Sequence, residues 1–172
     1  SSDLEHAETQ TVTGKLDAIS FSERRLMLFF APKRRSLACS YNEDLEVMLW
    51  ENRRELVQVR GRVVLDVDGF PQRIDDVEEI MELDLSPFKI AAIHLPGYQL
   101  VARQPFDLLP VMSEDEQLLV LEHEPWGLHV FAHTRAQLNE DLKEQLDMLW
   151  REYAKEEDDV LTKDALAVKR QL

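Results

Sequence analysis

The stretch TRAQLNEDLKEQLDMLWREY, residues 134–153, carries the clearest pattern in the chain. Thr134 stands three residues before Gln137, the spacing of a capping box in which each side chain bonds the other residue's backbone N–H. Neither glycine nor proline interrupts the run. The pattern predicts an amphipathic helix whose apolar face is buried against a sheet. That face is made by residues at helical spacing: Leu138, Leu142, Leu146, Leu149, Trp150 and Tyr153.

The sequence before this helix supplies the expected sheet. Strand-like runs cover residues 99–109, 117–124 and 128–133, and Pro125-Trp126-Gly127 makes a turn between the last two. We therefore expect a short antiparallel sheet packed on the long helix, together forming a module over residues 98–172. Residues 84–97 hold two prolines and a glycine and are predicted to be a connection.

The end of the chain is predicted to be a link followed by a short helix, whose Leu166 and Val168 could pack back. Residues 155–159, KEEDD, read as an acidic link in solvent. Thr162 can cap a last short helix over residues 163–172.

The first part of the chain predicts a small β-rich module over residues 11–83. Residues 1–10 are polar and are expected to be a disordered lead-in. Asp68-Gly69 indicates a hairpin with a type I′ turn, in which both central residues need a positive φ. The expected elements are strands at 11–22 with a bulge near Ala18, 25–30 and 36–41, a helix at 43–53 after Asn42, and strands at 57–67 and 72–83 with a bulge at Asp75-Asp76.

Composition narrows the class of protein. Apolar residues make up 44% of the 172 residues, enough for a core, and no apolar run reaches the roughly 18 residues of a membrane helix. The single cysteine, Cys39, precludes an internal disulfide and favours a cytoplasmic setting. Its place in an alternating strand predicts a core residue.

The net charge of −14 is unevenly distributed. Residues 84–172 carry 9 basic and 17 acidic residues, a net charge of −8. A polyanion would be repelled by that segment, because phosphate contacts supply most non-specific affinity for nucleic acid. The acidic half suits a basic protein partner, but on charge alone it is better explained by plain solubility.

Residues 11–83 resemble an OB-fold in the order of their elements. Three strands, a helix and a hairpin of two strands follow one another, as in the five-stranded OB barrel. The resemblance implies a basic groove with aromatic stacking platforms for single-stranded nucleic acid. Phe29 or Phe30 and Tyr41 could supply those platforms. The matching cations are Lys33, Arg34, Arg35, Arg60 and Arg62.

Residues 127–142, GLHVFAHTRAQLNEDL, resemble the HicB-like antitoxin family. In that family a short strand ends in a capping threonine and runs straight into an amphipathic helix, which forms part of a β-β-β-α unit with a partial RNase H-like fold. His133 stands where the family usually has a glycine. The resemblance implies a partner-binding role. The residues that match the family pattern are Thr134, Arg135, Gln137, Leu138 and Leu142.

Motifs of catalysis and cofactor binding are missing from the sequence. It contains no phosphate-binding loop, dinucleotide fingerprint or nucleophile elbow, and only five glycines. His123 and His129 could face each other across a hairpin, but a metal needs further ligands converging on one point. The sequence thus predicts no catalytic residues, no metal and no cofactor.

Partner-binding residues are predicted on the acidic second module. Trp126 lies in a turn, where tryptophan either forms an interface hot spot or covers the core. Trp50 and Trp150 lie on apolar helix faces and are expected in the core. The predicted set is Trp126, His129, Glu140, Asp141 and Glu144.

Together these features predict an α+β fold: a small OB-like antiparallel barrel, then a short sheet on one long helix. The first functional hypothesis is a non-enzymatic, antitoxin-like or immunity-like neutraliser of a basic protein, such as a nuclease toxin. The alternatives are an accessory protein that binds single-stranded nucleic acid through the barrel, and a structural or oligomerisation module. The oligomeric state stays open.

Overall fold

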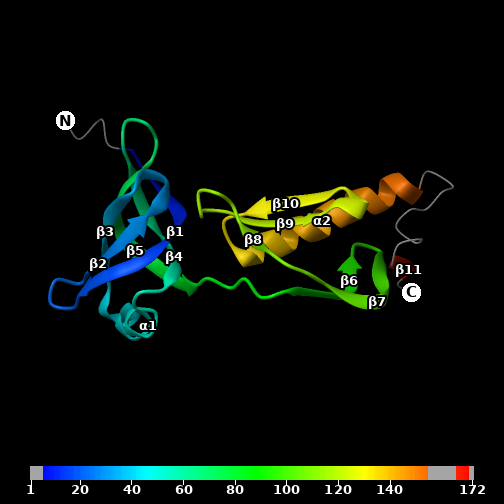
Figure 1. Ribbon diagram of the computed structural model, residues 1–172, viewed down its shortest axis with the longest axis horizontal. Helices are drawn as coiled ribbons and strands as arrows, with labels where there is room; N and C mark the ends of the chain where they lie inside the picture. Colours follow the sequence, from blue (N-terminus) through cyan, green and yellow to red (C-terminus); the bar gives the residue numbers. More distant parts are fainter. Residues whose placement is uncertain (1–5, 155–165, 171–172) are drawn as a thin grey trace. The chain divides into compact units, whose positions relative to one another are not determined.

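The computed structural model describes residues 6–154 and 166–170, which form a mixed α+β fold (Figure 1). The chain divides into two compact units. The first runs to Leu83 and also includes Glu114–Gln117, whereas the second comprises Asp84–Ser113 and the chain from Leu118 onward. This division differs from the predicted one, because 84–97 belongs to the second unit and 114–117 to the first.

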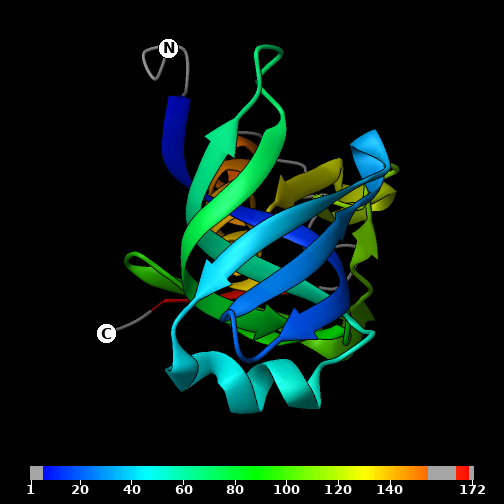
Figure 2. The same ribbon diagram turned by 90° about the vertical axis from the view of Figure 1, so that its left-hand side faces the viewer.

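Five strands of the first unit pair in a closed ring, in the order β1-β2-β3-β5-β4. The β3–β5 pair is parallel and the other pairs are antiparallel. Figure 2 shows these strands wrapping around one another. Their bounds are β1 His6–Ser20, β2 Arg25–Phe30, β3 Arg35–Tyr41, β4 Leu56–Leu65 and β5 Pro71–Glu82.

Alternating side chains fill the interior of this ring. Leu28, Leu37 and Val59 are fully buried, as is Cys39, which confirms its predicted place in the core. Burial raises the pKa of the Cys39 thiol to about 12, because a thiolate would lose its hydration there. Gly14 allows β1 to approach β2 closely, since a Cβ there would lie 2.5 Å from the carbonyl oxygen of Phe29.

Helix α1, Glu46–Glu51, lies across one end of the ring (Figure 2). A short 3-10 helix, Glu43–Leu45, precedes it, so the predicted helix is present over a shorter range. Leu49 is fully buried in the core. Trp50 was expected in the core, but it is 55% exposed because it lies on the opposite face of this helix.

The predicted bulges are confirmed, and the predicted turn type is wrong. The β1–β2 register shifts between Leu16 and Ala18, and Asp76 adopts a φ of 62° where the β4–β5 register shifts. In the loop that joins β4 to β5, residues 66–70, only Gly69 has a positive φ, 85°. The Asp66 carbonyl accepts the Gly69 N–H, and Asp66 N–H donates to the Phe70 carbonyl. This is a three-residue loop ending in a left-handed glycine, which needs one positive φ and not two.

The predicted disordered lead-in is wrong over residues 6–10, which form the start of β1. They pair with β4, from His6 opposite Leu65 to Gln10 opposite Gly61. Backbone hydrogen bonds to β4 hold this polar segment, which is why apolar patterning gave no signal. Residues 1–5 lie outside the described residues.

The second unit contains two three-stranded sheets and helix α2, Arg135–Ala154. One sheet has the order β10-β9-β8 and the other β11-β7-β6. The strand bounds are β6 Phe88–Leu95, β7 Tyr98–Leu108, β8 Val111–Met112, β9 Leu119–His123, β10 Leu128–Ala132 and β11 Leu166–Arg170.

Three predictions for this unit are corrected. Residues 84–97 are not only a connection, because they contain β6, which Pro87 and Pro96 flank without interrupting. The strand predicted at 99–109 pairs with β6 and β11 and not with the sheet beneath α2. Within the helix predicted at 163–172, residues 166–170 instead form β11, because pairing with β7 overrides a weak helical pattern. The predicted acidic link at 155–159 lies outside the described residues.

Helix α2 confirms the pattern that predicted it. Leu138, Leu142 and Leu146 are buried, and the helix packs against β10, β9 and β6. Thr134 Oγ1 accepts the Gln137 backbone N–H at 3.2 Å, as predicted. The reciprocal half of the capping box is wrong, because the Gln137 side chain donates to Asp141 at 2.8 Å instead.

Arg135 fixes the start of α2 to the segment before β6. Its guanidinium donates to the carbonyl of Ser86 at 2.7 Å and lies 3.9 Å from the centroid of the Phe88 ring. Asp84, 3.5 Å from the same guanidinium, has a lowered pKa, chiefly because Ser86 donates to its carboxylate. None of the described helices is long and apolar enough to cross a membrane.

Candidate functional site

The structure brings together three of the five residues predicted to bind a partner. His129, Asp141 and Glu144 line one shallow groove between β10 and α2 with a volume of about 380 Å³. The remaining walls come from Val130, Phe131, Gln145 and Met148. Glu140 is exposed on α2 but pairs with Lys143 at 3.6 Å and does not line the groove.

The edge of a sheet runs along this groove. β10 lies at the end of the order β10-β9-β8, so one side of its backbone has no partner strand among the described residues. Gln145 on α2 occupies that side at one residue. Its Oε1 accepts the His129 N–H at 2.7 Å, and its Nε2 donates to the His129 carbonyl at 3.1 Å. The glutamine amide thus reproduces the pair of hydrogen bonds that a neighbouring strand would make.

Backbone alternation indicates a second open position two residues further on. In an antiparallel strand, residues i and i+2 direct their N–H and C=O groups to the same side. Since His129 directs its groups to the open edge, Phe131 does so too. The Phe131 side chain is 55% exposed. Within the described part of the chain, the edge therefore offers one pair of backbone groups that a side chain covers, at His129, and one pair that nothing covers, at Phe131.

The charges around the groove are acidic. Asp141 is half-buried and accepts the hydrogen bond from Gln137, whereas Glu144 is exposed. His129 Nδ1 lies 2.9 Å from the Glu122 carboxylate across the β9–β10 pair. Met148, 56% exposed, and Phe131 add apolar surface beside these carboxylates.

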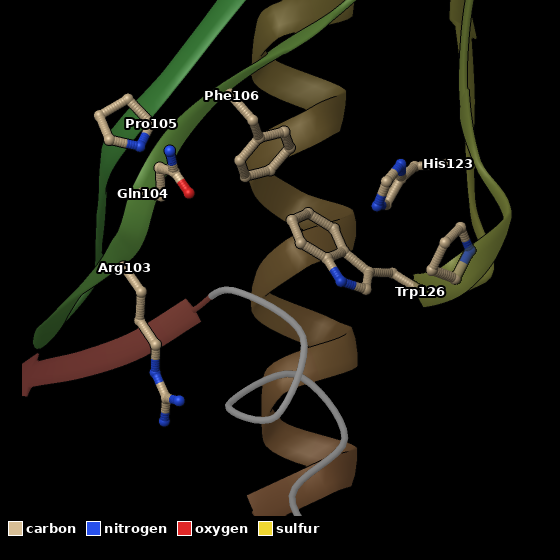
Figure 3. A pocket seen from close by; sticks show the side chains of 7 residues that line it. Arg103, Gln104, Pro105, Phe106, His123 and Trp126 are labelled. Atoms are coloured by element: carbon tan, nitrogen blue, oxygen red, sulfur yellow. The ribbon is translucent and has the colours of Figure 1, made fainter.

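Trp126, the fourth predicted residue, has a different environment. It is 2% exposed, so it covers the core and is not the exposed hot spot that was the other prediction. Its ring forms one wall of a separate cavity of about 550 Å³, with Phe106 and His123 close to it (Figure 3). The cavity is also lined by Arg103, Gln104, Pro105 and Pro125.

The histidines do not meet as a metal site would require. His123 lies opposite Leu128, and His129 lies opposite Glu122, so the two rings do not face each other across the hairpin. In the described part of the chain, no three His, Cys, Asp or Glu side chains gather as metal ligands.

Three of the five predicted cations of the barrel already have partners. Lys33 lies over the Phe70 ring at 3.9 Å, Arg35 binds Asp66 at 2.6 Å, and Arg60 lies 4.0 Å from Glu78. The Arg35 side chain is the first cause of the lowered pKa of Asp66. Arg34 and Arg62 are exposed.

Of the three residues predicted to offer stacking platforms, Phe29 is half-buried and the other two are not on the surface. Phe30 and Tyr41 are buried in the core, where a base could not stack on them. Burial also raises the pKa of the Tyr41 hydroxyl, with smaller effects from Glu46 and Arg24. Exposed rings instead occur at Phe21 and Trp50, whose centroids lie 6.3 Å apart.

Sequence reasoning missed the residues that complete both sites of the second unit. Gln145 and Met148 lie on α2 beside the predicted acids, and their spacing of i+4 from Asp141 and Glu144 respectively could have shown that they share a face. Arg103 and Phe106 on β7 gave no signal, because only the tertiary structure places β7 beside the β9–β10 turn.

Comparison of the chain with protein-family models, with curated proteins and with solved structures finds no match in any of the three.

Proposed function

We propose that the second unit is a non-enzymatic binding module that takes an extended, basic segment of a protein partner along the edge of β10. The observation that carries the proposal is the groove in which His129, Asp141 and Glu144 surround an open strand edge. An added strand gains affinity from backbone hydrogen bonds, and its side chains provide specificity.

The β10 edge supports this binding mode because it has no neighbouring strand among the described residues and yet its backbone groups are covered at one residue. Unpaired strand edges promote aggregation, and proteins commonly blunt them with charge or cover them. Here the cover is a single side chain, Gln145, which two hydrogen bonds hold on His129. An incoming strand can replace that amide bond for bond and also pair with Phe131.

Charge selects the partner. Asp141 and Glu144 flank the edge, and Glu140 lies on the same helix, so a lysine- or arginine-bearing strand is attracted while an acidic one is repelled. A second copy of this chain is a poor occupant, because two-fold pairing of β10 would bring the same carboxylates together. The groove is therefore assigned to a different, basic protein.

The HicB-like resemblance supports a neutraliser role. The order β8, β9, β10, α2 agrees with the β-β-β-α unit of that family, and α2 directly follows β10 through the capping Thr134. A nuclease toxin fits the proposed chemistry, since its basic substrate-binding surface would meet the acids that mimic a nucleic acid. The toxin identity rests on the resemblance and the charge alone.

The test uses the full chain and a peptide of alternating lysine and valine, followed by amide NMR. Saturable shifts confined to β10 and the adjacent face of α2 are expected. The double variant Asp141→Asn, Glu144→Gln should weaken binding by about tenfold, because two attractive charges are lost. Shifts scattered over both units, or equal binding of a glutamate–valine peptide, would contradict the proposal.

A matched variant distinguishes the effect of the two groove charges from the effect of the net charge of the protein. Asp17→Asn with Glu23→Gln removes the same two charges from exposed positions of the barrel and should leave peptide affinity unchanged. The same pair of variants then serves in affinity purification from the native host. The proposed partner is a basic protein whose recovery is lost with the groove variant and retained with the barrel variant.

A second candidate function is binding of single-stranded nucleic acid by the first unit, which we propose to be an OB-like barrel. The strand order β1-β2-β3-β5-β4 and the position of α1 between β3 and β4 support that likeness. The specific observation is the exposed Trp50 ring, with the Arg53 guanidinium 4.2 Å from its centroid. An exposed ring beside a cation is what base stacking uses.

Filter binding of a single-stranded oligonucleotide at rising salt tests this alternative. Trp50→Ala should abolish most retention if a base stacks on that ring, whereas Val47→Ala, also exposed on α1, serves as the control. Salt-independent or absent retention of the unaltered protein would remove the candidate.

A further inference from the structure

The cavity beside Trp126 differs from the groove at the β10 edge in its lining and in its chemistry. It lies between β7, which supplies Arg103 and Phe106, and the end of β9 with the turn that follows it, which supply His123 and Trp126 (Figure 3). Its volume of about 550 Å³ is within the range of small-molecule sites. None of the residues named as its lining is among those that line the β10 groove.

Three aromatic rings form an angular wall around the cavity. Phe106 meets Trp126 edge to face, with centroids 5.3 Å apart and planes at 82°. His123 meets the same indole at 4.5 Å and 73°. Phe106 and His123 are closer to parallel, at 28°, with centroids 5.9 Å apart. This arrangement presents ring faces and edges in two directions, which suits a planar apolar group.

The indole nitrogen of Trp126 is a hydrogen-bond donor that needs an acceptor. Nε1 is buried and has no hydrogen-bond partner among the residues that the structure describes. A buried donor without a partner costs about 1–3 kcal/mol, and so such groups in native proteins are rare. In Figure 3 the nitrogen lies on the edge of the ring turned away from Phe106. An acceptor that reached this edge of the ring would satisfy it.

Arg103 defines the charge of that acceptor. Among the described residues that line the cavity, it is the only side chain of fixed positive charge. It is exposed, and it makes no ion pair with any of the described residues. One guanidinium matches one monoanion, and a carboxylate accepts from both a guanidinium and an indole N–H. A phosphate dianion would need more positive charge than this lining offers.

We propose that this cavity binds a planar aromatic carboxylate. The aromatic group of the ligand packs among Phe106, His123 and Trp126, and its carboxylate accepts the Trp126 Nε1–H and faces Arg103. The site is independent of the β10 groove, so the two proposals stand or fall separately.

Naphthoate is a suitable probe, and the indole N–H resonances of the isotope-labelled full chain are the readout. The Trp126 resonance is identified as the one missing from Trp126→Phe. Titration with naphthoate should shift that resonance saturably and leave those of Trp50 and Trp150 in place. A carboxylate that hydrogen-bonds the indole produces such a selective change, whereas non-specific apolar binding would not.

Two variants and a neutral analogue separate the parts of the site. Arg103→Gln should weaken naphthoate binding about tenfold, and Lys89→Gln, which removes an exposed charge from β6, should not change it. Trp126→Phe keeps an aromatic ring but removes the donor, and should also weaken binding about tenfold. Naphthamide should bind more weakly than naphthoate and be indifferent to Arg103→Gln, because it carries no charge.

Several outcomes would overturn the proposal. One is a Trp126 resonance that does not move up to the solubility limit of naphthoate. Another is a folded Trp126→Phe variant that binds as tightly as the unaltered chain. Equal affinity for naphthoate and naphthamide would overturn the role of Arg103 and with it the assignment of a carboxylate. Because Arg103 is exposed, its variant tests the proposal even if the substitution at buried Trp126 disturbs folding.

Discussion

The two units of this protein differ in whether their sheets have open edges. In the first unit every strand of the ring β1-β2-β3-β5-β4 has two neighbours, so the ring has no open edge. In the second, the two sheets have three strands each, and β10 lies at an edge that is covered at His129 by the Gln145 side chain. The closed ring is stabilised by a buried interior of mostly aliphatic side chains. The open sheets expose backbone groups, polar side chains and cavities.

This difference suggests where stability and binding reside. A closed sheet leaves no backbone donor or acceptor for a partner, and therefore recognition must use its side chains. An edge strand offers backbone groups to any extended chain, and the acids of α2 then restrict which chain is accepted. We therefore expect core substitutions in the barrel to act on stability, and substitutions around β10 and β7 to act mainly on binding.

The largest expected effect is that of Leu28→Ala in the barrel. Leu28 is fully buried, and its truncation leaves a cavity in a closed interior that has little room to collapse. A loss of about 2–5 kcal/mol in the free energy of unfolding is expected. Hydrogen exchange measured residue by residue should show faster exchange in β1 to β5.

Leu142→Ala is the matched substitution in the second unit, where Leu142 is 2% exposed on α2. It should accelerate exchange in α2, β9 and β10 and spare the barrel strands. Equal acceleration throughout the chain by either substitution would show that the two units unfold as one, and the comparison between them would lose its thermodynamic meaning.

Gln117→Ala should have the next largest effect, and it acts on the barrel although the residue is distant in sequence. The Gln117 amide accepts the Thr13 N–H at 3.0 Å and donates to the Thr13 carbonyl. Gln117 is 8% exposed and Thr13 is 2% exposed, so the substitution leaves buried backbone groups unpaired. A loss of about 1–3 kcal/mol is expected in chemical denaturation.

Glu114→Ala is the control for this substitution, because Glu114 is exposed in the same loop. It should change the free energy of unfolding by less than about 0.5 kcal/mol. If Gln117→Ala were equally harmless, water would satisfy Thr13 as well as the glutamine does.

The elements that the sequence predicted correctly are those with a long, one-sided apolar pattern. Helix α2 follows from Leu138, Leu142 and Leu146, and the barrel strands follow from their alternation. The sequence does not predict β6, because Pro87 and Pro96 resemble the breakers of a connection. In the structure they lie on either side of a strand that alternates through Phe88 and Ile90. β11 was missed because a five-residue strand takes its structure from its partner β7 and not from its own sequence.

The candidate sites were predictable only in part, for a related reason. Charge identified Asp141 and Glu144, and a short strand identified His129, because these signals are local. The role of Gln145 depends on a side chain reaching a backbone across two elements, which no sequence pattern records. The environment of Trp126 depends on β7, so sequence alone left its burial undecided.

A smaller effect is expected from Gln145→Ala, which removes the cover from the β10 edge. The His129 amide should exchange faster, with a loss of about 0.5–1.5 kcal/mol in its protection, because its hydrogen bond to Gln145 is gone. The lysine–valine peptide should bind a few-fold more tightly, since it no longer competes with the glutamine. Asn139→Ala, which removes a half-buried amide of the same helix that does not line the groove, is the control. Slower exchange or weaker peptide binding would refute the idea that Gln145 stands in for a strand.

The smallest expected effect on stability at neutral pH is that of replacing Tyr98 of β7. The Tyr98 hydroxyl donates a hydrogen bond to Asp147 of α2. Burial, and then this carboxylate, raise the pKa of Tyr98 from 10.0 to about 12. The unfolded chain therefore releases the tyrosine proton at lower pH than the folded chain does. Below pH 10 the contribution to stability is complete, and it is lost as the pH rises toward 12. Tyr98→Phe should remove this part of the alkaline destabilisation, as measured by denaturant unfolding at a series of pH values.

Asp147→Asn separates the two causes of the raised pKa. It removes the negative charge but keeps Tyr98 buried, so the ultraviolet titration of Tyr98 should move toward its ordinary value without reaching it. Arg151, which donates to the same carboxylate at 3.0 Å, then loses a partner, and the lowering effect that it exerts on Tyr98 is no longer opposed by Asp147. Cys39 provides the counterpart in the barrel: its pKa is raised mainly by burial, so no single charge removal should restore it. If Tyr98 titrated at its ordinary pKa in the unaltered protein, its hydroxyl would not be buried against Asp147. The hydrogen bond between β7 and α2 would then not hold these two elements together in solution.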